Sequence, residues 1–286
     1  MRQIIVPSND VVLNASSVGE GEPILFLHGY PDDQRTWEFQ TREFKNEFQC
    51  ISFDLRGFGG SSKPSSVKSY SMESLIRDVD SILAYFKISK PIHLVGHDWG
   101  SMIGWLYVSN PELAKKIKSF TAISCPHPVL AKKVLLEHTK SLNVDYLWTQ
   151  FTKSWYISFF QIPLLPEVLI ELFPEVFWKK MLRDGEIPET DPMWKYNKGE
   201  IFANSLSPIK LYRNFLIENF PWENVAITTR TQVLVATKDL AISPFLYEGM
   251  EAYIPNLSVE RLAANHWVHR ERWQETNQLL RNFWNR

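Results

Sequence analysis

The chain has 286 residues, of which 44% are hydrophobic and 22% are charged, a composition typical of a globular protein with a sizeable core. A formal net charge of -1 and a pI near 6.7 argue against nucleic acid or an anionic membrane surface as a partner. Cys50 and Cys125 do not make a disulfide framework in a chain of this length, and we place both in buried strands of a cytoplasmic protein. Neither a signal-peptide pattern nor an apolar run of ~18 residues is found, so we expect no stable membrane insertion.

Short apolar runs alternate with amphipathic segments through the first part of the chain. Strands are predicted at Val11–Val18, Pro23–Leu27, Cys50–Asp54, Ile92–Val95 and Phe120–Ser124, and helices at Trp37–Phe44, Ser71–Phe86 and Gly100–Ser109. The strands are apolar throughout. That pattern is typical of a parallel sheet with helices on both faces.

The alternation stops between His127 and Ser207, where the segments have helical spacing and are dense in aromatic residues. It resumes with strands at Gln232–Ala236 and Leu257–Arg261, a helix near Pro244–Tyr253 and a closing helix from about Glu271. We therefore predict one α/β core domain of residues 1–126 and 208–286 and a helical insertion at residues 127–207. The aromatic residues of the insertion fit a lid over an apolar tunnel, with a membrane or partner surface as the alternative.

One junction between a predicted strand and a predicted helix has the outline of a nucleophile elbow. Leu94–Ser101 reads L-V-G-H-D-W-G-S, in which two glycines flank the turn as they do in G-x-S-x-G. Asp98 stands where that motif carries serine. Taken alone, the pattern also fits a chance turn or an aspartate that caps the following helix.

Two later residues complete the chain order nucleophile, acid, histidine. Asp239 follows the strand Gln232–Ala236, and His266 follows the strand Leu257–Arg261. Because active groups gather at the carboxyl ends of the strands in an open α/β sheet, we predict that both side chains lie close to Asp98. His269 is the alternative base, whereas His97 and His28 are expected to be packing or structural residues.

These residues belong to a set of motifs with a family resemblance. The motifs are H-G-Y-P at His28–Pro31, D-L-R-G-F-G-G-S at Asp54–Ser61, G-H-D-W-G at Gly96–Gly100, K-D at Lys238–Asp239 and N-H-W at Asn265–Trp267. With them the chain resembles an α/β-hydrolase over essentially its whole length, and within that superfamily a soluble epoxide hydrolase. The resemblance implies a mostly parallel sheet flanked by helices, with the insertion as a helical cap, and it implies no cofactor and no metal.

A carboxylate nucleophile suits a saturated carbon that carries a leaving group. Asp98, with a reference pKa near 3.9, is ionised at neutral pH and can form an alkyl ester with such a carbon. Water activated by His266 would hydrolyse the ester, while Asp239 orients the imidazole. The backbone N–H groups of Trp99 and Tyr30 are predicted to form the oxyanion hole.

An epoxide oxygen leaves as a basic alkoxide and needs a proton donor, for which tyrosine is suitable. The resemblance assigns this role to Tyr156, in Y-I-S-F-F-Q-I-P, and to Tyr212, in L-Y-R-N-F; each could instead be an aromatic residue of the core. The first motif departs from the family at Leu164, where glycine is usual. Trp99 and Trp267 are predicted to contact the substrate.

We predict an epoxide hydrolase that converts a small lipophilic epoxide and water to a vicinal diol. A haloalkane or haloacid dehalogenase that uses the same Asp98 is the alternative. One residue argues against this alternative, because dehalogenases resemble one another in having asparagine at the position of Tyr30. A non-catalytic ligand-binding α/β-hydrolase is a distant third, and the sequence leaves monomer and homodimer both open.

Overall fold

The computed structural model describes residues 3–218 and 226–285. Within these residues one eight-stranded sheet has the order β1-β2-β4-β3-β5-β6-β7-β8. Strand β2 pairs antiparallel with β1 and β4, and the pairings from β4 through β8 are parallel. The strands are β1 Ile4–Ser8, β2 Val11–Val18, β3 Glu22–Leu27, β4 Phe48–Phe53, β5 Ile92–His97, β6 Ile117–Ile123, β7 Arg230–Ala236 and β8 Leu257–Leu262.

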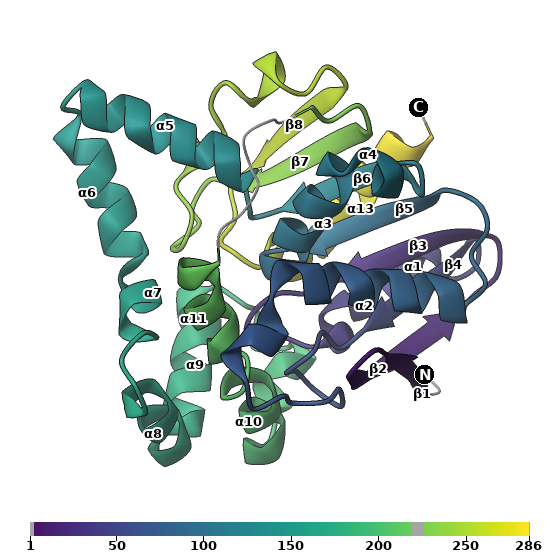
Figure 1. The fold of residues 1–286 in the computed structure, drawn as a ribbon, viewed down its shortest axis with the longest axis horizontal. Helices are drawn as coiled ribbons and strands as arrows, with labels where there is room; N and C mark the ends of the chain where they lie inside the picture. Colours follow the sequence, from purple (N-terminus) through teal and green to yellow (C-terminus); the bar gives the residue numbers. More distant parts are fainter. Residues whose placement is uncertain (1–2, 219–225, 286) are drawn as a thin grey trace.

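Helices cover both faces of this sheet (Figure 1). They are α1 Glu38–Phe44, α2 Met72–Tyr85, α3 Trp99–Ser109, α4 Pro111–Ala114, α12 Val268–Glu271 and α13 Trp273–Trp284. One buried cluster joins α2 and α3 to the sheet through residues such as Leu75 and Ile103, and another joins α1 and α13 through Phe44 and Leu280. The predicted α/β-hydrolase architecture, a mostly parallel sheet between two layers of helices, is therefore confirmed.

Helix α2 illustrates how the local sequence sets an element. The Ser71 side chain accepts a hydrogen bond from the Ser74 N–H and caps the first turn. Leu75, Val79 and Ile82 then recur on one face with helical spacing and are fully buried against the sheet. The element runs within one residue of the range that periodicity predicts.

Between β6 and β7 the described residues form helices joined by turns and loops, with no strand. Its helices are α5 Pro128–Lys140, α6 Val144–Lys153, α7 Trp155–Phe159, α8 Leu165–Leu172, α9 Pro174–Asp184, α10 Lys198–Ser205 and α11 Ile209–Ile217, with the 3-10 turn η3 Pro192–Lys195. Helices α5 to α8 follow one another along one side of the molecule, and α11 lies closer to the sheet (Figure 1). The run of helices continues past residue 207 to Ile217, and we keep the limits 127–207 of a separate cap domain as a proposal.

Two local predictions differ from the structure. The segment Pro244–Tyr253 forms two 3-10 turns, η4 Pro244–Tyr247 and η5 Met250–Ala252, because Gly249 takes φ 72° between them and ends any regular helix. Cys50 lies in β4, but Cys125 lies beyond the end of β6; both thiols are free and buried. Of the helices that the structure describes, none combines the length and the apolar character needed to span a membrane.

Candidate active site

Asp98 stands at a sharp turn between β5 and α3. Its backbone has φ 50° and ψ -117°, a strained conformation for a non-glycine residue. Gly100 can have no side chain, because a Cβ there would overlap the Leu27 carbonyl oxygen, and a Cβ at Gly96 would lie 2.5 Å from the backbone of Gly100. The elbow predicted from the two glycines is therefore present, with a carboxylate at its tip.

The structure brings Asp98, Asp239 and His266 together at the carboxyl ends of β5, β7 and β8. The His266 Nδ1 lies 2.8 Å from the Asp239 Oδ2, and its Nε2 faces the Asp98 Oδ1 at 3.9 Å. Asp239 is held in turn, since its Oδ1 accepts the N–H groups of Ala241 (2.7 Å) and Ile242 (3.0 Å). This is the arrangement of a nucleophile, a base and the acid that orients the base.

His269, the alternative base, points elsewhere. Its Nε2 lies 2.8 Å from the Thr36 hydroxyl, and its side chain is fully buried. The imidazole that faces Asp98 is that of His266.

The charges of these groups depend on one another. Burial by itself would lower the pKa of His266, but the charge and hydrogen bond of Asp239, together with the charge of Asp98, raise it to about 9. Burial raises the pKa of Asp98 against the opposing effects of His266 and of the N–H groups of Tyr30 and Trp99. The His266 imidazole thus carries an extra proton while Asp98 is a free carboxylate. Any reaction that neutralises Asp98 lowers the pKa of His266 and favours the neutral imidazole, whose Nε2 can accept a proton.

The two backbone N–H groups expected in an oxyanion hole both reach the Asp98 carboxylate. The N–H of Tyr30 donates to Oδ2 at 2.8 Å, and the N–H of Trp99 also hydrogen-bonds the carboxylate. The loop carrying Tyr30 can approach this closely because a Cβ at Gly29 would lie 2.5 Å from Asp98 Cβ and Oδ2.

Tyr156 on α7 and Tyr212 on α11 lie together opposite the elbow. Their rings are 5.8 Å apart at 83°, and their side chains share a hydrogen bond. Burial raises the pKa of both phenols, so both keep their protons at neutral pH. Leu164, between α7 and α8, takes φ 65° in the left-handed region, which explains why glycine suits this position.

A cavity of about 500 Å³ connects these groups. Its lining includes Asp98, His266, Tyr156, Tyr212 and Trp267. Most of the remaining wall is apolar and comes from α7, α8 and α9, through Phe159, Leu169, Ile170, Phe173, Val176 and Phe177. The sequence analysis did not single out these wall residues. Their helical spacing marks an apolar face but does not say which cavity that face meets.

The Trp99 side chain differs from the prediction. Its indole is 5% exposed and packs edge-on against Tyr212 (5.0 Å between ring centroids) and Phe215 (5.6 Å). Trp99 is not among the described residues that line the cavity, whereas Trp267 is. The indole of Trp99 thus supports Tyr212, with which it hydrogen-bonds, and its predicted contact with the substrate is not supported.

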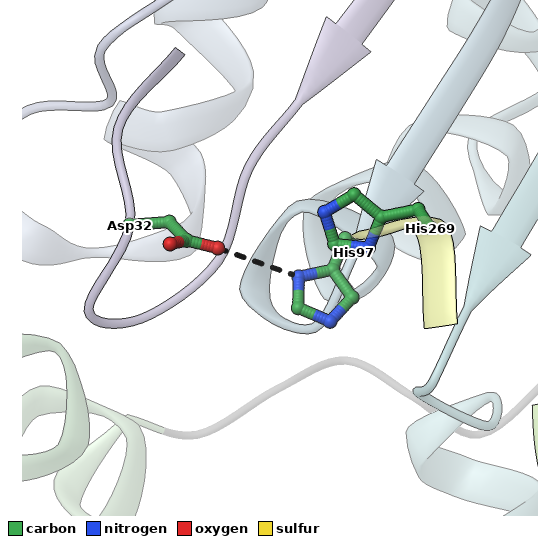
Figure 2. A group of neighbouring side chains, drawn as sticks. All are labelled: Asp32, His97 and His269. Carbon is green, nitrogen blue, oxygen red and sulfur yellow. Dashed lines mark ion pairs between the residues drawn. The ribbon is translucent and has the colours of Figure 1, made fainter. Parts of the chain in front are cut away.

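One cluster among the described residues has side chains of the kind that bind metals: Asp32, His97 and His269, all fully or almost fully buried (Figure 2). The Asp32 Oδ2 already accepts hydrogen bonds from Trp267 Nε1 (2.9 Å) and from the Thr36 hydroxyl (3.1 Å). It lies 4.0 Å from the His97 Nδ1, whereas ligands about 2.1 Å from a zinc ion at tetrahedral angles lie about 3.4 Å apart. The present spacing suits a hydrogen-bonded network better than a metal centre.

Comparison with known proteins identifies the family of this chain. Residues 22–272 match the alpha/beta hydrolase fold family. Epoxide hydrolase 4 of Mus musculus is 32% identical over 273 residues, covering 91% of this chain and 72% of that protein. Epoxide hydrolase 3 of Xenopus tropicalis is 30% identical over 271 residues, 91% of this chain and 70% of that protein.

Solved structures give the same result. The epoxide hydrolase of Bacillus megaterium in complex with an inhibitor superposes with a TM-score of 0.81 at 28% identity, over 99% of this chain and 100% of that one. A mutant of an epoxide hydrolase from the same organism, complexed with its product (R)-3-[1]naphthyloxy-propane-1,2-diol, also gives 0.81, at 29% identity and with the same coverage. This chain is therefore a member of the alpha/beta hydrolase fold family and, within it, resembles the epoxide hydrolases.

Proposed function

We propose that this protein is an epoxide hydrolase, which opens a lipophilic epoxide to a vicinal diol through an alkyl ester on Asp98. The observation that carries the proposal is the meeting, in one apolar cavity, of the Asp98 carboxylate, the His266 imidazole and two protonated phenols. The relatives named as epoxide hydrolases support the same activity.

In the first half-reaction the Asp98 Oδ1 attacks an epoxide carbon. The Tyr30 N–H holds the other oxygen, Oδ2, and so assigns Oδ1 the role of nucleophile. As the C–O bond of the epoxide breaks, the oxygen takes a proton from Tyr156 or Tyr212, which avoids a free alkoxide in an apolar cavity. An ester and a hydroxyl group result, and His266 has no part in this step.

In the second half-reaction water hydrolyses the ester at Cγ of Asp98. Once Asp98 is an ester, its charge no longer holds the extra proton on His266. The imidazole releases that proton to the solvent, and its neutral Nε2 can then take a proton from the attacking water. The negative charge that develops on Oδ2 is stabilised by the N–H groups of Tyr30 and Trp99.

Collapse of this intermediate breaks the bond between Cγ and Oδ1. The diol leaves with Oδ1 and the proton held by His266, so the water oxygen remains on Asp98. The second proton of the water is released from the new carboxyl group and restores the phenol. As the Asp98 carboxylate returns, His266 takes back from the solvent the proton that it released. The sum is one epoxide and one water giving one diol, with every group of the protein returned to its starting state.

The cavity indicates the substrate class. Its walls are mostly apolar and its volume is about 500 Å³. The diol bound to the Bacillus megaterium mutant carries a naphthyl ether, so we propose aryl and alkyl epoxides as substrates here. The cytoplasmic location and the choice between monomer and homodimer stay predictions.

The test compares styrene oxide with 1-bromobutane. We expect diol formation from styrene oxide and little bromide release, because two phenols that can protonate an epoxide oxygen line the cavity and Tyr30 stands where dehalogenases have asparagine. Faster bromide release than diol formation would instead support the dehalogenase alternative.

A further inference from the structure

The backbone carbonyl of His266 accepts two hydrogen bonds from side chains at the ends of neighbouring strands. The His97 Nε2 lies 3.0 Å from this oxygen, and the Ser124 hydroxyl donates to it at 2.7 Å. His97 is the last residue of β5, and Ser124 directly follows β6. Both side chains are completely buried. The peptide of the proposed base is thus fixed to the sheet from two directions.

The hydrogen bond fixes the tautomer of His97. A carbonyl oxygen only accepts, so the proton of the neutral imidazole is on Nε2. Burial, with further contributions from His269 and His266, holds the pKa of His97 well below its ordinary value, and Nδ1 therefore carries no proton. This nitrogen faces the Asp32 Oδ2 at 4.0 Å and has no hydrogen-bond partner among the described residues (Figure 2). The one N–H of His97 is directed at His266.

The residues that follow His266 are also held in place, by hydrogen bonds that involve Asp32 and Thr36. Trp267 Nε1 donates to Asp32, and the Thr36 hydroxyl lies between the Asp32 carboxylate and the His269 Nε2. The His97 ring packs against the same loop, 4.9 Å from the His266 ring and 4.3 Å from the His269 ring. Neither His97 nor Ser124 lines the cavity described above, so both act through another residue.

His97 also links the base to the nucleophile. It directly precedes Asp98, at which the chain turns sharply from β5 into α3. Asp98 faces the cavity while His97 reaches the peptide of His266. Because the two residues share a peptide bond, the distance between nucleophile and base depends on this hydrogen bond.

We infer that His97 and Ser124 are positioning residues that hold His266 where it can activate water. This inference rests on the proposed function, in which His266 acts only in ester hydrolysis. Loss of either donor should therefore slow hydrolysis of the ester and leave its formation almost unchanged. A change that merely damaged the fold would lower both rates together.

The experiment measures the two rates separately with styrene oxide, following the alkyl ester on Asp98 by rapid quench and intact mass. For His97→Leu and Ser124→Ala we expect ester hydrolysis to slow by about 10- to 100-fold, the loss typical of a displaced catalytic group, while ester formation changes by less than about threefold. His97→Gln keeps an N–H close to the position of Nε2 and should restore most of the hydrolysis rate. The double variant His97→Leu/Ser124→Ala should accumulate the most ester.

His93→Leu is the matched control. His93 is a second buried histidine of β5, but it bonds to the Ser119 hydroxyl (2.7 Å) and packs against Trp284, away from the cavity. This variant should lose stability without changing the ratio of the two rates.

For Ser124→Ala, equal losses in ester formation and ester hydrolysis would overturn the inference, and so would an unchanged rate of hydrolysis. This test does not depend on whether His97→Leu folds. If His97→Gln did not restore ester hydrolysis, the N–H of His97 would not have the proposed positioning role. Absence of any ester in the wild-type protein would instead refute the proposed function.

Discussion

The Tyr30 N–H donates a 2.8 Å hydrogen bond to the Asp98 Oδ2, although the two residues are 68 positions apart in the chain. The hydrogen bond makes the two carboxylate oxygens different. In the proposed mechanism Oδ2 occupies the position where the oxyanion develops, while Oδ1 lies on the side of His266, 3.9 Å from Nε2. The proposed oxyanion hole is therefore formed around Asp98 before any substrate binds, which would reduce the reorganisation needed during reaction.

His266→Gln should separate the two half-reactions. Ester formation does not use the imidazole, so the variant should react once with styrene oxide and stop. Intact mass spectrometry should show the protein heavier by one substrate, with turnover reduced by about 10²- to 10⁴-fold. The corresponding His269→Gln variant is the control and should not accumulate the adduct. Normal turnover by His266→Gln would exclude His266 as the base.

Tyr156 and Tyr212 should be needed together. Each Tyr→Phe change removes one proton donor, and we expect each single variant to retain part of the activity and the double variant to lose about 10²-fold or more in ester formation. Tyr196→Phe, which alters a phenol outside the cavity lining, should leave the rate unchanged. Stopped-flow or rapid-quench measurement of ester formation distinguishes these outcomes, and an active double variant would remove the phenols from the mechanism.

The stability provided by His266 should decrease with rising pH. Its pKa is raised from 6.5 to about 9 in the folded protein, so its stabilising interaction with the carboxylates is complete below pH 6.5 and is lost as the pH rises through about 9. The difference in unfolding free energy between wild type and His266→Gln should therefore be greatest below pH 6.5 and should shrink toward pH 9. Urea unfolding at several pH values measures it, and a difference that grows with pH would contradict the assignment.

Leu164→Gly should stabilise the protein. Leu164 has φ 65° and a side chain that is 73% exposed, so glycine relieves backbone strain and sacrifices little packing. We expect a gain of about 1 kcal/mol in the free energy of unfolding. Leu172→Gly is the control: this exposed residue ends α8, and the change should cost up to about 1 kcal/mol. Destabilisation of both variants by the same amount would show that the strain at Leu164 is not significant.

Local patterns in the sequence predict most of the fold. An apolar run followed by glycine gives the elbow at Asp98, and the order of strands in the chain places Asp239 and His266 at the same sheet edge. These patterns can be recognised in the sequence because each depends on a few adjacent residues and on the rule that active groups gather at the carboxyl ends of parallel strands.

The features that sequence did not predict depend on contacts between distant segments. The Trp99 indole turns to Tyr212, which is far along the chain, and the partners of His97 come from the loop after β8. We expected His97 to be a packing residue, because its neighbours in the sequence do not show which atom its Nε2 meets. The exposure of cap aromatics such as Trp148 (64%) and Phe151 (65%) likewise depends on which faces of α6 the other helices cover.

A single turnover in H₂¹⁸O, with enzyme in excess over styrene oxide, tests the central claim most directly. Because water attacks Cγ of Asp98 and the diol departs with Oδ1, the first turnover should place ¹⁸O in the Asp98 carboxylate and leave the diol unlabelled. Peptide mass spectrometry locates the label in the protein, and mass analysis of the diol completes the balance. A diol that carries ¹⁸O after the first turnover, with an unlabelled Asp98, would contradict the ester mechanism.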